Sequence, residues 1–139
     1  MTPIEWTPKM LTHPAFDDEH RALVDMINQM EALYDGKKPS AEESVSAITK
    51  LLERMNSHTK NEEALMHKTA YTRLIPHKIE HDHFTAKLSD FCDDIKNGNA
   101  TLCEESTLFI RTWLYDHIVS VDKLFAKWLN EKGLLQQTA

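Results

Sequence analysis

Hydrophobic residues recur every three or four positions along four stretches of the chain, which is the period of one face of an α-helix. The stretches cover about residues 18–35, 41–69, 74–97 and 102–130. None of them alternates apolar and polar residues as a half-buried strand does. Because the links between the stretches are short, consecutive helices are expected to run antiparallel. The pattern therefore predicts one all-α domain, an up-down-up-down four-helix bundle.

Capping signals indicate where these helices begin and end. Asp17 is the expected N-cap of the first helix, and Asp35-Gly36 follows its last turn. The segments Ser40 to Glu43 and Thr101 to Glu104 have the capping-box pattern, which predicts the starts of the second and fourth helices. Residues 1–16 contain three prolines and no helical period, so they are expected to form an extended N-terminal arm.

A histidine and a carboxylate interrupt the apolar stripe of the second helix. His58 and Glu62 are four residues apart, so on a helix they share one face with Leu51, Met55 and Leu65. A carboxylate buried in such a stripe is costly unless a positive partner compensates it. A metal ion is the simplest such partner.

The other three helices supply further ligands on their apolar faces. These are His20 in the first, His77 and His81 in the third, and His117 and Asp122 in the fourth. In an up-down-up-down bundle, the starts of the first and third helices lie at the same end as the final halves of the second and fourth. Topology and spacing therefore bring all seven side chains to one end of the core.

Five imidazoles and two carboxylates are too many ligands for one metal ion and suit two ions bridged by the carboxylates. These ligand types bind iron, manganese, copper or zinc, and no cysteine lies on the stripes to favour a structural zinc site. His117 and Asp122 are separated by about 140° on an ideal helix, so we predict a π-turn that brings them together. Beyond this point the stripe is expected to continue through Val121, Leu124 and Trp128.

Together, the seven residues resemble the ligand pattern of the hemerythrin family, in particular its bacterial single-domain branch. The resemblance covers nearly the whole chain. The neighbouring segments that match are Glu62-Glu63-x-x-Met66, Tyr71 and Trp113-Leu114-x-x-His117-Ile118.

The resemblance implies two iron ions joined by an oxo or hydroxo bridge. The implied ligands are His77, His81 and His117 for one iron, His20 and His58 for the other, and Glu62 and Asp122 as bridges. This set leaves the second iron five-coordinate, and dioxygen is expected to bind reversibly at its open position.

The stretch before the first ligand departs from the pattern of bacterial members. It lacks the usual glycine, and Glu19 stands where glutamine is usual. We interpret His13 as a surface residue of the arm that can approach the site. Four residues are expected to form a dry apolar wall that protects bound dioxygen, namely Met55, Trp113, Leu114 and Ile118.

Composition and charge exclude several other classes of protein. The chain has 139 residues, of which 41% are hydrophobic, as in ordinary globular domains. Its net charge is −6 and its basic residues are interleaved with acids, so no nucleic-acid surface is indicated. No apolar run reaches membrane length and residues 1–10 lack a secretory pattern, so we expect no membrane association and a cytoplasmic location. Cys92 and Cys103 are expected to be reduced core residues, although antiparallel helices also allow them to approach each other.

Three functions fit the sequence, of which non-enzymatic dioxygen binding for carriage, storage or delivery is favoured. The second is a di-iron enzyme that reduces peroxide or nitric oxide or oxidises iron, with Glu19, His13 and Tyr115 as its candidate acid–base groups. The third is an oxygen or redox sensor that acts through a separate partner, since this chain carries no output domain. A purely structural bundle leaves seven converging polar residues unexplained. The protein partner and the oligomeric state stay open.

Overall fold

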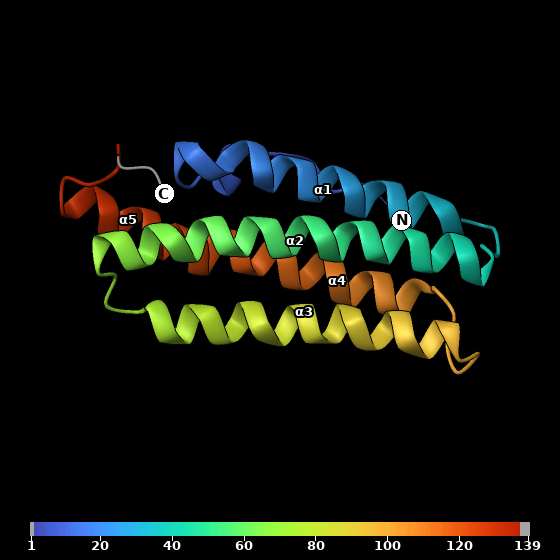
Figure 1. Cartoon of the computed structure of the whole chain (residues 1–139). Helices are drawn as coiled ribbons and strands as arrows, with labels where there is room; N and C mark the ends of the chain where they lie inside the picture. The colour runs from blue at the N-terminus through green and yellow to red at the C-terminus, as the bar shows by residue number, and fades with distance from the viewer. Residues whose placement is uncertain (1, 137–139) are drawn as a thin grey trace.

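The computed structural model describes residues 2–136, whose long helices lie side by side along one axis (Figure 1). Three helices are α1 (Pro14–Tyr34), α2 (Ala41–Thr69) and α3 (Leu74–Lys96). The fourth rod consists of α4 (Glu104–Asp116), the π-helical segment η2 (His117–Asp122) and α5 (Lys123–Glu131). A short 3-10 helix, η1 (Pro8–Met10), lies in the arm, and residues 2–136 contain no strand. The prediction of an antiparallel four-helix bundle is confirmed.

The first helix begins earlier than the sequence pattern predicts. It starts at Pro14 rather than near residue 18, and its N-cap is His13, whose ring accepts a hydrogen bond from Ala15 N at 2.9 Å. Proline suits this position because the first helical N–H has no partner within the helix. Asp17 is therefore not the cap. Its carboxylate accepts hydrogen bonds from the backbone N and hydroxyl of Thr12, at 2.8 and 3.2 Å, and so joins the arm to α1.

The predicted cap of the second helix is confirmed, and that of the fourth is not. Ser40 and Glu43 form the predicted capping box at the start of α2. The predicted box from Thr101 to Glu104 is wrong, because Cys103 occupies the N-cap of α4. The Ser106 hydroxyl accepts a hydrogen bond from Cys103 N and donates one to Cys103 O, both at 3.0 Å.

The N-terminal arm follows the outer surface of α1. The Asn28 side chain accepts a hydrogen bond from Ile4 N at 2.8 Å and donates one to Ile4 O at 3.0 Å. The guanidinium of Arg21 lies 5.1 Å from the ring centre of Trp6. These contacts hold residues of the arm on the body of the bundle, as expected for Trp6.

The interior contains two separate apolar clusters. The larger one includes Leu23, Met55, Phe84 and Ile118 and extends along most of the bundle. The smaller cluster fills the end where α2 leads into α3. It consists of Phe16, Leu65, Met66, Tyr71, Phe125 and Leu129. Along each of the four rods, the polar residues of the predicted site stand between members of the two clusters in the sequence.

The π-helical segment changes which residues of the last rod face the core. An extra residue in the turn advances the buried stripe by one position. Leu124, predicted as a core residue, is 42% exposed, whereas Phe125 is 1% and Leu129 0% exposed. The predicted stripe is therefore wrong at Leu124, whereas Trp128 is partly buried against the smaller cluster. The π-turn itself was correctly predicted.

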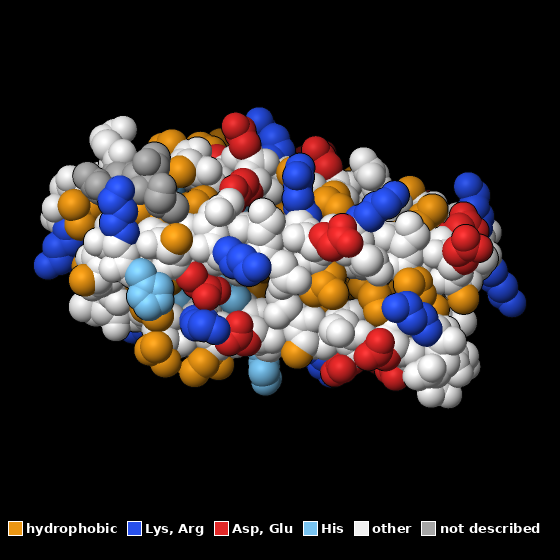
Figure 2. Space-filling model, in the orientation of Figure 1, with side chains coloured by type: hydrophobic (Ala, Val, Ile, Leu, Met, Phe, Trp, Pro, Cys, Tyr) orange, Lys and Arg blue, Asp and Glu red, His pale blue; other side chains and the backbone are white. Residues whose placement is uncertain are grey.

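The visible face of the protein (Figure 2) carries charges of both signs, and its two cysteines differ in exposure. Figure 2 shows acidic and basic side chains interspersed over the visible face. Within residues 2–136, each helix is too short or too polar to cross a membrane. Cys92 is buried and Cys103 is exposed, and both are free. The expectation of a core position therefore holds for Cys92 alone.

Candidate metal centre

All seven predicted site residues lie together in the core, near the end of the bundle where α2 leads into α3. Each of them is at most 3% exposed to solvent. They come from α1 (His20), α2 (His58, Glu62), α3 (His77, His81) and η2 (His117, Asp122). The four rods thus all contribute to one polar cluster, as the topology predicts.

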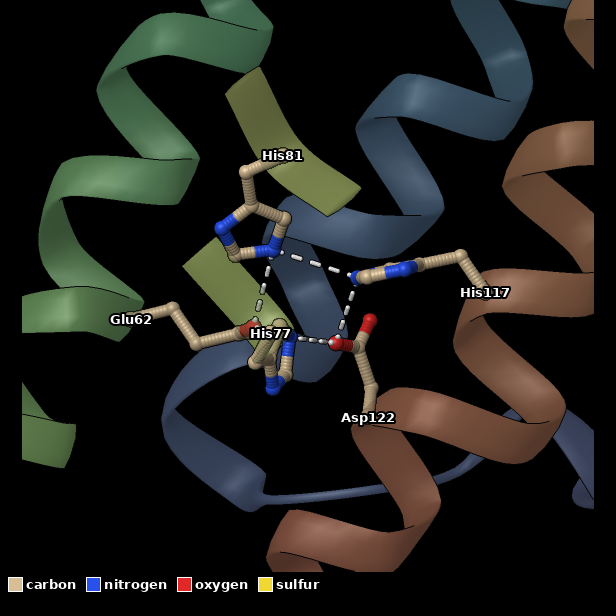
Figure 3. Close-up of side chains that lie close together, drawn as sticks. All are labelled: Glu62, His77, His81, His117 and Asp122. Atoms are coloured by element: carbon tan, nitrogen blue, oxygen red, sulfur yellow. Dashed lines mark hydrogen bonds and ion pairs between the residues drawn. The ribbon is translucent and has the colours of Figure 1, made fainter. Parts of the chain in front are cut away.

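The ligand atoms form two overlapping groups, and within each group all atoms lie within 4.8 Å of one another. The first group, drawn in Figure 3, contains Glu62, His77, His81, His117 and Asp122. The second group contains His20, His58, Glu62 and Asp122. Both carboxylates therefore belong to both groups, and each group has the size and composition of a metal site.

The two oxygens of Glu62 face different groups. Its Oε1 atom lies 2.7 Å from Nε2 of His77 and 3.3 Å from Nε2 of His81. Its Oε2 atom lies 3.3 Å from Nε2 of His58 and 3.8 Å from Nε2 of His20. A carboxylate held in this way can bind one metal ion through each oxygen.

Asp122 has the same arrangement because the π-turn directs it inward. Its Oδ1 atom lies 3.0 Å from Nε2 of both His77 and His117. Its Oδ2 atom lies 3.1 Å from Nε2 of His20. On a regular α-helix the five-residue spacing would separate His117 and Asp122 around the helix axis, so η2 is what allows both to face the cluster.

Four of the five imidazoles are held from behind through Nδ1, while Nε2 faces the cluster. The outer partners are Glu19 for His58 (2.7 Å), Glu63 for His81 (2.9 Å), Glu80 for His117 (3.3 Å) and Thr12 for His20 (3.4 Å). A carboxylate on Nδ1 favours the tautomer whose lone pair is on Nε2, which is the form that binds a metal. Such outer partners are typical of metal-binding histidines.

The roles of Glu19, Glu63 and Glu80 behind the imidazoles were not predicted from the sequence. A signal for all three exists, because each directly precedes or follows a ligand in the sequence. Each of them contacts a histidine on a different helix rather than on its own. Spacing along a single helix therefore does not reveal these contacts.

The inner atoms need positive charge between them. Nε2 of His20 lies 3.1 Å from Nε2 of His58, and the same distance separates His81 and His117. Two imidazoles with their protons on Nδ1 would turn lone pairs toward each other at these distances. Among residues 2–136, Glu62 Oε1 and the Asp122 oxygen that faces His20 accept no hydrogen bond. These orphaned acceptors and facing lone pairs fit metal cations.

The pKa values of the site residues also indicate that the cluster requires positive charge. Burial lowers the pKa of His20, but the neighbouring carboxylates of Asp122 and Glu62 outweigh it and raise this pKa to about 10. Burial also opposes protonation of His58, and contacts with Glu19 and Glu62 raise its pKa to about 9. Burial raises the pKa of Glu62, but its contacts with the surrounding imidazoles hold it well below its usual value. Without metal, protons supply the positive charge that the cluster requires.

The other two candidate acid–base groups, His13 and Tyr115, differ in their burial. His13 is not a surface residue, since it is 3% exposed. Its ring lies 5.4 Å from that of Phe16, which in turn lies 5.8 Å from that of His58. Tyr115 is at the surface, where it lines a groove with residues of the arm.

On one side, the site contacts apolar side chains of the larger cluster. Met55, Leu114 and Ile118 are each at most 2% exposed. Trp113 is partly buried and stacks on His117, with 4.5 Å between ring centres and 12° between planes. The opposite face of the site contacts the smaller cluster through Phe125, whose ring centre is 6.3 Å from that of His77. Apolar side chains therefore flank the polar cluster on both sides along the bundle.

Comparison with known proteins agrees with this architecture. The model of the hemerythrin HHE cation binding domain matches residues 12–129. Bacteriohemerythrin from Methylococcus capsulatus is 31% identical over 115 residues, which cover 82% of this chain and 86% of that protein. Myohemerythrin from Theromyzon tessulatum is 27% identical over 121 residues, covering 86% of this chain and 88% of the relative. A crystal structure of wild-type hemerythrin has a TM-score of 0.81 and 29% identity, and the match covers 91% of this chain and 97% of that chain. Since the family match includes all four rods and all seven residues of the polar cluster, the chain belongs to the hemerythrin family.

Proposed function

We propose that this protein holds two iron ions and binds dioxygen reversibly, for carriage, storage or delivery. The observation that carries the proposal is the division of each carboxylate between two ligand groups. One oxygen of Glu62 faces His77 and His81, and the other faces His58. A single-metal site has no need of such an arrangement, whereas two neighbouring ions require it.

The ligands divide unequally between the two ions. His77, His81 and His117 would hold one iron, His20 and His58 would hold the other, and Glu62 and Asp122 would contribute to both. The second iron would then have fewer protein ligands than the first, which leaves room for dioxygen. When bound, the two irons would supply electrons to dioxygen and recover them when the gas leaves.

The chain's own residues favour reversible binding over onward chemistry. Met55, Leu114 and Ile118 exclude water, and with it protons, from the interior of the site. The carboxylates Glu19 and Glu63 lie behind their imidazoles, on the Nδ1 side away from the inner cluster. There they orient ligands and raise their basicity rather than deliver protons to a bound gas.

The test is a visible spectrum of the iron-loaded, chemically reduced protein, recorded without oxygen, after exposure to air and after renewed deoxygenation. We expect a charge-transfer band that appears with air and disappears on deoxygenation, at an iron content of two per chain. A direct and permanent change to an oxidised spectrum would overturn reversible binding and favour a redox enzyme or a sensor. An iron content of one per chain would overturn the two-iron assignment.

A further inference from the structure

A small pocket opens at the surface directly beside the polar cluster. Its volume is about 150 Å³, and its lining includes Tyr71, Arg73, His77 and Glu80. At about 30 Å³ for each water molecule, it has room for roughly five waters or one ligand of a few heavy atoms. The pocket therefore lies against the side chain of one predicted ligand, His77.

His77 differs from the other four imidazoles in what lies behind it. Three of the others have a carboxylate on Nδ1 and the fourth has the Thr12 hydroxyl. The Nδ1 atom of His77 is buried and has no hydrogen-bond partner within residues 2–136. Its Nε2 atom faces Glu62 and Asp122, so Nδ1 is turned away from them, as Figure 3 shows. A buried N–H donor without an acceptor is destabilising, so an acceptor is expected in the pocket that His77 lines.

The surroundings of the pocket favour a negatively charged acceptor. Arg73 occupies the N-cap of α3 without a capping side-chain hydrogen bond, so the pocket lies at the positive end of a 23-residue helix. The guanidinium of Arg73 also acts on the neighbouring Tyr71 hydroxyl, whose pKa burial raises and Arg73 lowers. Glu80, the one acid of the lining, is already held by Nδ1 of His117.

We propose that this pocket binds a small carboxylate, which accepts a hydrogen bond from Nδ1 of His77 and pairs with the guanidinium of Arg73. The bound anion takes the place that Glu19, Glu63 and Glu80 occupy behind their own imidazoles. The inference rests on the proposed function, because His77 presents an N–H at Nδ1 when its Nε2 lone pair binds a metal.

The consequence is regulation of the iron centre by an anion from solution. An acceptor on Nδ1 makes an imidazole a stronger electron donor, which stabilises the oxidised metal. His77 and His117 belong to the same ligand group, and Glu80 already acts on His117. Occupation of the pocket thus completes the outer contacts of that group and lowers its reduction potential.

The experiment uses formate as the probe and the full-length, iron-loaded protein. Formate binding is measured by isothermal titration calorimetry for the natural protein, for Arg73→Gln and for Arg54→Gln, an exposed control on α2. Chloride at equal ionic strength controls for charge alone. We expect saturable formate binding that weakens roughly tenfold or more in Arg73→Gln and is unchanged in Arg54→Gln, since one charge-assisted pair is lost.

A redox titration gives the second readout. Formate should lower the reduction potential in the natural protein and in Arg54→Gln but not in Arg73→Gln. Crystals grown with formate should show it between His77 and Arg73.

Three results would overturn the inference. Equal affinity in Arg73→Gln means that formate binds elsewhere, for instance on the open iron. Density in the pocket without saturable binding in solution means an adventitious ion only. Absence of binding together with normal reversible oxygen spectra removes the pocket and leaves the proposed function intact. Conversely, Arg73-dependent binding without reversible oxygen spectra supports the pocket and removes the proposed function.

Discussion

Glu19 and His58 are joined across two helices, with 2.7 Å between Oε1 of the acid and Nδ1 of the imidazole. The other oxygen of Glu19 accepts a hydrogen bond from Asn61 at 3.0 Å, so the carboxylate is fixed at both ends. Its neighbour in the sequence is His20, which lies in the same ligand group as His58. One dipeptide of α1 therefore supplies one ligand of that group, His20, and orients another, His58.

This relationship predicts a graded effect of substitutions at Glu19. Glu19→Ala should weaken metal binding by about 10–100-fold, because His58 loses the partner that fixes its ring and tautomer. Glu19→Gln keeps an acceptor for Nδ1 and should recover most of this loss. Iron affinity is measured by chelator competition, with the exposed neighbour substitution Asp18→Ala as control. Equal affinities of Glu19→Ala and Asp18→Ala would show that the hydrogen bond has no role in metal binding.

The raised histidine pKa values predict how pH affects stability without metal. Relative to the ordinary value of 6.5, the pKa rises to about 10 for His20 and about 9 for His58 in the folded state. Their stabilising contribution is complete below pH 6.5 and is lost progressively as the pH rises to about 10. The melting temperature of the metal-free protein, followed by circular dichroism, should therefore fall across this range.

The iron-loaded protein should not show this decline, because metal ions replace the protons between the same nitrogens and oxygens. If the melting temperatures of the metal-free and iron-loaded proteins fell equally with pH, protons and metal would not compete for the polar cluster.

The same competition predicts that metal affinity increases with pH. Binding requires every imidazole to release its Nε2 proton, and the raised pKa values make this release costly at neutral pH. Apparent iron affinity should rise from pH 6 to 9 and iron should be lost in acid. Competition with a chelator whose own protonation is corrected measures this dependence. An affinity independent of pH would contradict the assignment of the imidazoles as ligands.

The π-turn predicts an unusual pair of mutational effects at adjacent positions. Phe125→Ala should destabilise the fold by about 3–5 kcal/mol, because the ring is 1% exposed and stacks near Tyr71. Leu124→Ala should change stability by less than about 0.5 kcal/mol, since that side chain is 42% exposed. Urea unfolding of both variants gives the comparison. The opposite order would indicate that the last rod is a regular α-helix.

The sequence predicts most of the fold and all seven residues of the polar cluster, because helical spacing and topology determine both. The His58 and Glu62 pair needs only the four-residue period, and the five-residue step from His117 to Asp122 indicates the π-turn. The shift of the stripe from Leu124 to Phe125 follows from that same turn, but the predicted stripe kept the regular period.

Features that depend on contacts between helices were not predictable in this way. The start of α1 depends on the path of the arm, which allows His13 rather than Asp17 to serve as the cap. The contacts of Glu63 and Glu80 depend on side-chain directions across the bundle. Residue spacing within one helix contains no information about either.

The polar layer between the two apolar clusters has a consequence for cooperativity. Seven polar side chains separate the smaller cluster, with Phe16, Tyr71 and Phe125, from the larger one. In the metal-free protein, the polar contacts at this boundary depend on protonated imidazoles beside the carboxylates, so the short end becomes less tightly coupled to the rest as the pH rises. Local opening of the smaller cluster should then precede global unfolding. Metal ions that bind ligands from all four rods at once join the two clusters into a single folding unit, so that loading turns a two-stage molecule into an all-or-none one.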